Sequence, residues 1–229
     1  MEETRMIKVT VEDKTYTYPY GTPYRTVAAD FQSRLPWDIL LVNRDGKLCE
    51  LHKVLDRDCS LKMVTARDKP GIQTYERSAV FLMLKAFYDV AGRENVRRLS
   101  VEYSLSSALF ILAQGNFTLD QSLLERVEAR MRELAALALP IEKHSMNTDD
   151  AVELFQRAGM VHKAQLLSFR INSHVNVYSL DGFVDYFYGY MVPDTGYIKC
   201  FGLELFENGF VLRLPTQQDP GRLGDFRPS

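Results

Sequence analysis

Apolar and polar residues alternate near the start of the chain in the manner of β-strands. Residues 6–11 read Met-Ile-Lys-Val-Thr-Val, and residues 15–19 read Thr-Tyr-Thr-Tyr-Pro after a tight turn. Side chains of a strand point alternately to its two faces, so these segments predict a hairpin. The apolar run at 39–42 predicts a short buried strand, and the turn signal Asn-Arg-Asp-Gly follows it.

One helix and three further strands complete the predicted first unit. Pro23 suits the first turn of a helix, and strands are expected at 47–51 and 60–66. The resulting order, β-β-α-β-β-β, suggests a ubiquitin-like roll over residues 1–68. The sequence Asp-Lys-Pro-Gly at 68–71 predicts a boundary, because Pro and Gly interrupt both helices and strands.

Helical spacing alternates with strand-like segments over residues 72–215. Thr118 and Gln121 have the spacing of a capping box, which predicts a helix from there to about residue 139. Further helices are expected at 75–91, 149–158 and 161–168. Strands are expected at 98–103, 141–145, 175–180, 183–190, 197–206 and 210–214. This pattern predicts an α+β domain with a largely antiparallel sheet.

Composition narrows the classes of protein that fit. The 229 residues are 46% hydrophobic and 25% charged, which is ordinary for a globular protein. A formal net charge of -2 excludes the strong positive field of a general nucleic-acid binder. The three cysteines form no CxxC pair, and no signal peptide or membrane-spanning run is present. We expect a cytoplasmic protein with no membrane partner, and residues 216–229, rich in Gly and Pro, predict a linker.

Motifs for known chemistry are absent from the sequence. It has no GxxxxGK[ST], GxGxxG, HExxH or GxSxG, and its four histidines are scattered. His162 and Lys163 follow Gly159 near a helix start, where they would either bind an anion or form a solvated turn. Arg97 and Arg98 are expected to be a charged strand end.

The densest cluster of aromatic residues lies at 186–190. Strand alternation would place Tyr186, Tyr188 and Tyr190 on one face and Phe187 on the other. Stacked tyrosines bind bases or nucleosides, and their hydroxyls form hydrogen bonds. The alternative is a sheet face packed against a helix.

Two segments resemble known families. Residues 20–23, Tyr-Gly-Thr-Pro, with the strand order resemble the TGS domain, a ubiquitin-like module of threonyl-tRNA synthetases and some GTPases. Asp185, Gly189 and the Val-Pro, Thr-Gly and Ile-Lys pairs at 192–199 resemble the second additional domain of threonyl- and alanyl-tRNA synthetases. That resemblance implies an α+β editing domain, which hydrolyses mischarged tRNA.

Four positions depart from the pattern of the editing family. The family has HSxxH on a helix, where this chain has Arg77 and Phe81 around Ser78. The family's later Cys and His correspond to Phe187 and Met191. None of the four replacements is a general base at neutral pH or a zinc ligand, so we expect no catalytic residue and no metal site.

The combination of the two domains resembles the N-terminal region of bacterial uridine kinase-like nucleoside kinases. This resemblance implies a kinase domain beyond the linker, which would use ATP and Mg²⁺ and be the partner of this chain. The chain itself would then be a binding or regulatory module without a cofactor. Its cleft would bind a nucleoside or an RNA end.

Five residues are the candidates for binding that ligand: Arg77, Lys163, Asp185, Tyr188 and Tyr190. Arginine suits planar, bidentate partners, and Asp185 would accept from a ribose hydroxyl or pair with Arg77. Two alternatives remain open. The chain is either a free-standing editing hydrolase of mischarged tRNA, or a structural or dimerisation module whose cleft is filled by Phe81, Phe187 and Met191.

Overall fold

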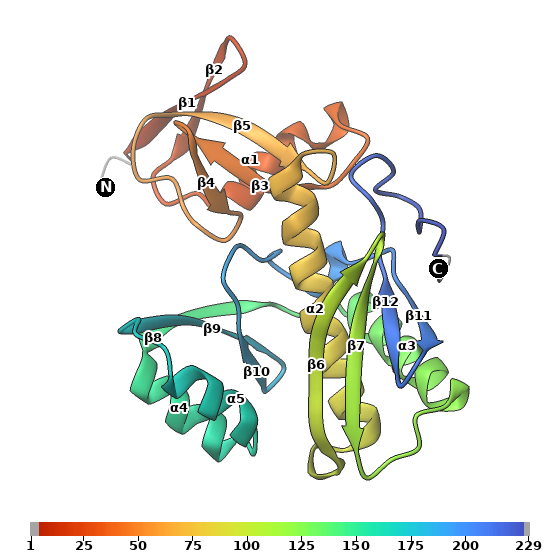
Figure 1. Ribbon diagram of the computed structural model, residues 1–229. Helices are drawn as coiled ribbons and strands as arrows, with labels where there is room; N and C mark the ends of the chain where they lie inside the picture. The colour runs from red at the N-terminus through yellow and green to blue at the C-terminus, as the bar shows by residue number, and fades with distance from the viewer. Residues whose placement is uncertain (1–4, 227–229) are drawn as a thin grey trace.

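The N-terminal unit is a mixed five-stranded sheet with one helix packed on it, as seen in the computed structural model, which describes residues 5–226 (Figure 1). Its elements are β1 (Met6–Val11), β2 (Lys14–Pro19), α1 (Tyr24–Phe31), η1 (Gln32–Arg34), β3 (Ile39–Arg44), β4 (Lys47–Glu50) and β5 (Cys59–Thr65). The strand order is β2-β1-β5-β3-β4, with β1 and β5 parallel. The chain order β-β-α-β-β-β is the predicted one, while the assignment to the TGS family stays a prediction.

A separate apolar core holds this unit together. Val27 and Phe31 of α1 pack against Ile7 and Val9 of β1, and all four are nearly inaccessible to solvent. Burying a side chain of this size stabilises the fold by about 1.5–3 kcal/mol. The apolar positions that predicted the hairpin and the helix are therefore the ones that build the core.

The long helix α2 (Lys69–Ala91) follows β5 almost directly and runs down between the other two sheets (Figure 1). Pro70 lies in its first turn, where a missing backbone N–H breaks no helical hydrogen bond. Gly71 lies so close to β5 that an added Cβ would overlap the carbonyl of Thr65. The helix predicted at 75–91 therefore begins six residues earlier, at Lys69, while the division of the chain into two domains near this point stays a prediction. The helix ends at Gly92, as expected, with φ of 84°.

Two antiparallel sheets flank α2. One contains β6 (Val96–Leu105), β7 (Ala108–Gly115), β11 (Gly202–Phe206) and β12 (Gly209–Arg213) in the order β11-β12-β7-β6, with α3 (Gln121–Ala136) against it. The other contains β8 (Glu142–Asn147), β9 (His174–Leu180) and β10 (Phe183–Tyr186), in the order β10-β9-β8, with α4 (Thr148–Arg157) and α5 (Val161–Ser168). The predicted α+β class with largely antiparallel sheets is confirmed.

Local details differ from the sequence predictions at three places. Strand β7 was not predicted, because its run of apolar residues lacks the alternation of a half-exposed strand. Helix α3 is capped by Asp120, whose side chain accepts from the N–H of Leu123 at 2.9 Å, so Thr118 is not the cap. Strand β10 ends at Tyr186, so the predicted strand at 183–190 is half its expected length, and η3 (Thr195–Tyr197) precedes β11.

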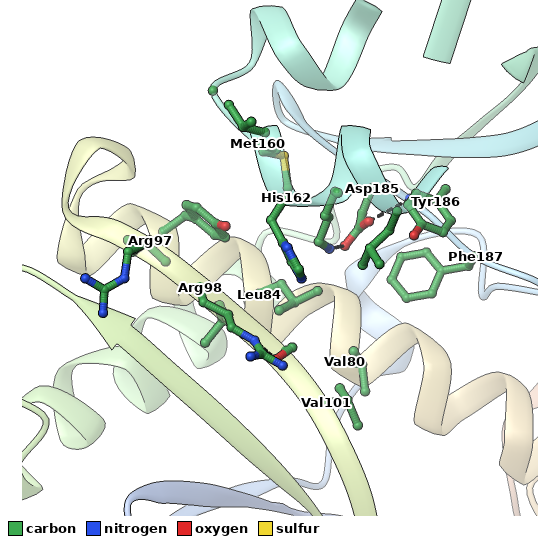
Figure 2. Close-up of a pocket in the computed structure, with 18 residues that line it drawn as sticks. Val80, Leu84, Arg97, Arg98, Val101, Met160, His162, Asp185, Tyr186 and Phe187 are labelled. Atoms are coloured by element: carbon green, nitrogen blue, oxygen red, sulfur yellow. Dashed lines mark hydrogen bonds and ion pairs between the residues drawn. The ribbon is translucent and has the colours of Figure 1, made fainter. Parts of the chain in front are cut away.

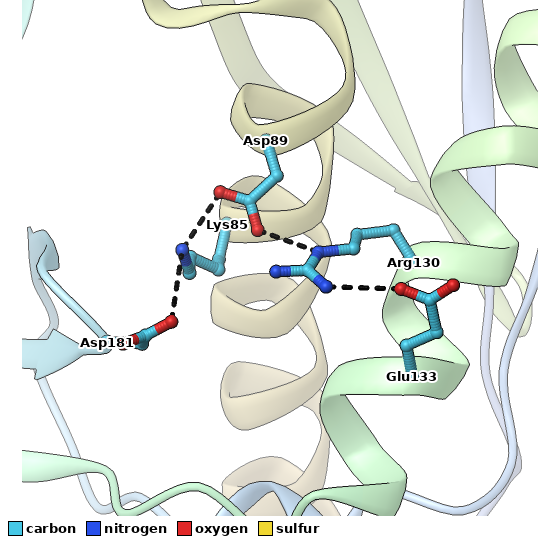
Figure 3. A network of polar contacts seen from close by, with 5 residues as sticks. All are labelled: Lys85, Asp89, Arg130, Glu133 and Asp181. Carbon is cyan, nitrogen blue, oxygen red and sulfur yellow. Dashed lines mark hydrogen bonds and ion pairs between the residues drawn. The ribbon is translucent and has the colours of Figure 1, made fainter.

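A network of charged side chains joins α2 to its neighbours (Figure 3). Lys85, which is nearly buried, donates to Asp89 at 2.9 Å and lies 3.9 Å from Asp181 in the turn between β9 and β10. Arg130 of α3 binds the other oxygen of Asp89 at 2.9 Å and also contacts Glu133. The network fixes α3 and the β9–β10 turn to the same stretch of α2.

The described part of the predicted linker, residues 216–226, lies against the body of the protein. Gln217 donates to the carbonyl of Arg67 at 2.9 Å, and Arg213 donates to the carbonyl of Gly224 at 2.9 Å. Phe226 packs edge-on against Phe206 with ring centroids 5.5 Å apart. The rest of the predicted linker, 227–229, and residues 1–4 of the first predicted domain lie outside the described residues. Within 5–226, none of the helices is long and apolar enough to cross a membrane.

Candidate functional site

Helix α2 supplies the first two of the four positions that depart from the editing family. Arg77 and Phe81 are one helical turn apart and therefore share a face, with Ser78 next to it. The other two positions, Phe187 and Met191, lie at the ends of a loop that leaves β10. We call this loop, residues 187–191, the pocket loop.

Arg77 holds the pocket loop. Its Nη1 donates to the carbonyl of Tyr190 at 2.6 Å, and a Cβ added at Gly189 would overlap the guanidinium. Gly189 also has φ of 140°, a conformation that favours glycine. Burial lowers the pKa of Arg77, and Tyr178 opposes that shift. The guanidinium nevertheless stays charged, because arginine keeps its proton in proteins.

The apolar replacements close one half of the site, which we call the closed half. Phe81 and Met191 are buried, and the rings of Phe81 and Phe187 lie edge to face with centroids 5.3 Å apart. Ser78 Oγ lies 3.9 Å from the sulfur of Met191 and accepts from the N–H of Val192 at 3.0 Å. Side-chain packing therefore occupies the space around these positions.

Lys163 and Asp185 form an ion pair in the other half of the site, the open half. Asp185 lies on β10 and its side chain is only 3% exposed, while Lys163 comes from α5 and is 19% exposed. The second carboxylate oxygen of Asp185 accepts from the N–H of Tyr186 at 2.8 Å. The expected pairing of Asp185 with Arg77 is wrong, because Lys163 occupies that role.

The open half borders a pocket of about 560 Å³, which is lined by residues of α2, β6, α5 and β10 (Figure 2). Apolar side chains from α2 and β6 form much of its wall, and Phe187 separates it from the closed half. The polar lining residues are Arg97, Arg98, Ser100, His162, Lys163 and Asp185. Sequence patterns identified His162–Lys163 as an anion-binding candidate, but they treated the two arginines as an ordinary strand end.

Of the three tyrosines predicted to stack on a base, Tyr186 lines this pocket, whereas Tyr188 and Tyr190 do not. Because β10 ends at Tyr186, the expected alternation does not continue along the pocket loop. Tyr188 is 49% exposed, and Cζ of Arg170 lies 4.4 Å from the centroid of its ring. The ring centroids of Tyr186 and Tyr188 are 5.9 Å apart. Tyr190 is partly buried and contributes its carbonyl to Arg77. Ligand-binding roles for Arg77, Tyr188 and Tyr190 stay predictions.

Sequence reasoning missed two polar residues beside the site. Glu50, at the end of β4, is 2% exposed, and its carboxylate accepts from the hydroxyl of Tyr178 at 3.1 Å and the N–H of Met191 at 3.0 Å. Burial and the adjacent Glu50 raise the pKa of Tyr178, so its hydroxyl stays protonated. Glu50 ends a four-residue strand that also begins with a charged residue, Lys47, so the local sequence carried no signal for it.

The chain is similar in sequence to one class of curated proteins, the threonine–tRNA ligases. It is 27% identical over 191 residues to a threonine–tRNA ligase of Halorhodospira halophila, covering 83% of this chain and 29% of the ligase. It is 30% identical over 168 residues to that of Methylococcus capsulatus, covering 69% of the chain and 25% of the ligase. For the ligase of Azobacteroides pseudotrichonymphae the values are 25% over 209 residues, with coverage of 86% and 31%.

The chain spans less than a third of the length of these curated relatives. No protein-family profile matches it. The matched region nevertheless covers more than two thirds of this chain in each case and includes both units in the longest alignments. Most of the chain is therefore similar to a part of threonine–tRNA ligases.

Proposed function

We propose that the chain is an editing-domain-like module that binds the 3′ end of a tRNA, with or without an attached amino acid, in the 560 Å³ pocket. The observation that carries the proposal is the Lys163–Asp185 pair. It lines an open pocket inside a region similar to threonine–tRNA ligases, while the neighbouring positions are filled by packing. The pair presents a cation and a carboxylate to the pocket, and such polar groups in a mostly apolar wall orient a bound ligand.

The size and lining of the pocket suit a terminal nucleoside. Small-molecule pockets range over about 300–1,000 Å³ and are mostly apolar with a few polar groups. Val80, Leu84 and Leu99 offer apolar contacts for a base, and Lys163–Asp185 offers hydrogen bonds for ribose hydroxyls. Arg97 and Arg98 line the same pocket from β6, where they would neutralise backbone phosphates. Arg98 is paired with Glu102 at 2.9 Å, so it would have to exchange this partner for a phosphate when RNA binds.

Fluorescence anisotropy with a labelled tRNA tests the proposal. The double variant Arg97→Ala/Arg98→Ala is expected to weaken binding on the order of tenfold at low salt, because two phosphate contacts are lost. The matched control is Lys8→Ala/Lys62→Ala, which removes two exposed positive charges from the N-terminal unit. Equal affinities of the two double variants would contradict the assignment of the pocket.

A second candidate function is hydrolysis of the bound aminoacyl ester. The observation that favours it is His162, which lines the pocket beside Lys163 and is a residue type that accepts protons near neutral pH. A deacylation assay with serine-charged tRNA measures it. Release of serine that disappears in His162→Ala would support hydrolysis, and release at the uncatalysed rate would leave binding as the function.

The synthetase names of the relatives support this editing-like interpretation better than the kinase-module interpretation. The kinase parent, with its ATP and Mg²⁺, stays a prediction from resemblance. A reading frame that continues past Ser229 into a GxxxxGK[ST] motif would support it. The filled cleft expected for a purely structural module agrees with the closed half of the site and disagrees with the open half.

A further inference from the structure

Glu50 connects the N-terminal unit to the editing-like site. It is the last residue of β4, and its side chain is 2% exposed. Three groups of the second unit donate to its carboxylate: Lys143 Nζ at 2.8 Å, the N–H of Met191 at 3.0 Å and the hydroxyl of Tyr178 at 3.1 Å. A buried carboxylate with this many donors is well compensated.

The pocket loop is held from three elements at once. Helix α2 binds it through Arg77 at Tyr190, and β9 places the single hydroxyl proton of Tyr178 between the Glu50 carboxylate and the carbonyl of Gly189, which is 3.2 Å away. Glu50 holds its last residue, Met191, by the backbone N–H. Among these contacts, Glu50 is the one that comes from the N-terminal unit.

The first residue of the same loop, Phe187, lines the pocket and packs on Phe81. A shift of the loop would therefore move the pocket wall. We propose that Glu50 is a positioning residue: the N-terminal unit sets the shape of the pocket by fixing the pocket loop through the Glu50 carboxylate. The inference rests on the proposed function only where it concerns RNA affinity.

Two further ion pairs join the two units away from the pocket loop. Asp38, in the segment before β3, pairs with Lys199 at 2.7 Å, and Arg25 of α1 pairs with Asp194 at 2.5 Å. Asp38→Asn therefore removes a carboxylate–lysine pair across the same interface and serves as the matched control for substitutions of Glu50.

Residue-resolved hydrogen exchange on the full chain tests the positioning role without any ligand. The measured quantity is the ratio of the Met191 to the Leu82 amide exchange rate, because Leu82 in α2 reports on global opening. Glu50→Ala is expected to raise this ratio at least tenfold. Glu50→Gln keeps an acceptor for Met191 and is expected to raise it less, and Asp38→Asn is expected to change it less than twofold. A ratio in Glu50→Ala equal to that in Asp38→Asn overturns the inference.

Affinity for labelled tRNA is the second readout. Where the unmodified protein binds the tRNA, Glu50→Ala is expected to weaken binding at least fivefold, and Asp38→Asn less than twofold. Unchanged affinity in Glu50→Ala then overturns the link between the loop and the pocket. If the unmodified protein does not bind tRNA, the proposed function fails, whereas the exchange ratio still decides whether Glu50 positions the loop.

Discussion

The closed and open halves of the editing-like site lie side by side but are built from opposite chemistry. In the closed half, the rings of Phe81 and Phe187 pack together, and the buried Met191 lies against Ser78. In the open half, Lys163 and Asp185 form a partly buried ion pair on the wall of a 560 Å³ pocket. The comparison shows that replacing polar by apolar side chains fills only the space next to the replaced positions. The neighbouring pocket stays open.

The largest expected effect concerns the closed half. Phe81→Ala removes a fully buried ring that contacts Phe183 and Phe187, and it should lower the free energy of unfolding by about 4 kcal/mol. Urea unfolding measures this change, with the exposed Val101→Ala as the control. A loss below about 1 kcal/mol would mean that the closed half is not well packed.

Removing one partner of the ion pair should have the next largest effect. Lys163→Met leaves the Asp185 carboxylate buried without its cation, which is expected to lower the free energy of unfolding by about 3 kcal/mol. Lys199→Met breaks an exposed ion pair with Asp38 and should change stability by less than about 1 kcal/mol. Equal losses in the two variants would show that water compensates the Asp185 carboxylate when its cation is removed.

The contact between Gly189 and Arg77 fixes the pocket loop, whose first residue, Phe187, lines the pocket. Gly189→Ala forces a Cβ against the guanidinium at a φ that favours glycine, so we expect a loss of about 2 kcal/mol in thermal or urea unfolding. In the double variant with Arg77→Ala, the clash is gone and only the backbone strain remains. A loss for the double variant that equals the sum of the single losses would rule out this contact.

The smallest expected effect is at the exposed tyrosine of the pocket loop. Tyr188→Ala should change the free energy of unfolding by less than about 0.5 kcal/mol, because the ring is 49% exposed and touches mainly Arg170. A larger loss would mean that the ring belongs to the closed half. A fall in tRNA affinity without a loss of stability would instead extend the open half to this surface.

Local patterns predicted most of the fold, and the exceptions have physical reasons. The alternation in β1 and the helical spacing of α1 reflect one-sided burial, which a sequence records directly. Strand β7 is apolar on both faces and left no period to detect. The start of α2 was predicted six residues too late because Pro and Gly interrupt most helices, whereas proline is compatible with the first turn, which is where Pro70 lies.

The site was only partly predictable for a related reason. Family positions identified the four replacements and the Lys163–Asp185 residues, but not which charges pair. Arg77 faces a backbone carbonyl and Asp185 faces Lys163 because the pocket loop turns at Gly189, and this turn is a tertiary feature. Glu50 is more than 120 residues from Tyr178 and Met191, so no local pattern connects them.

The direct passage from β5 into α2 has a consequence for dividing the protein. A cut at this point would separate Glu50 from Lys143 and uncover Leu40 and Ala66, which pack with the core of the second unit. Each fragment would then expose apolar surface, which favours aggregation, and unpaired charges to solvent. Truncation is therefore a poor route to soluble material, and both units should melt together in a single calorimetric transition.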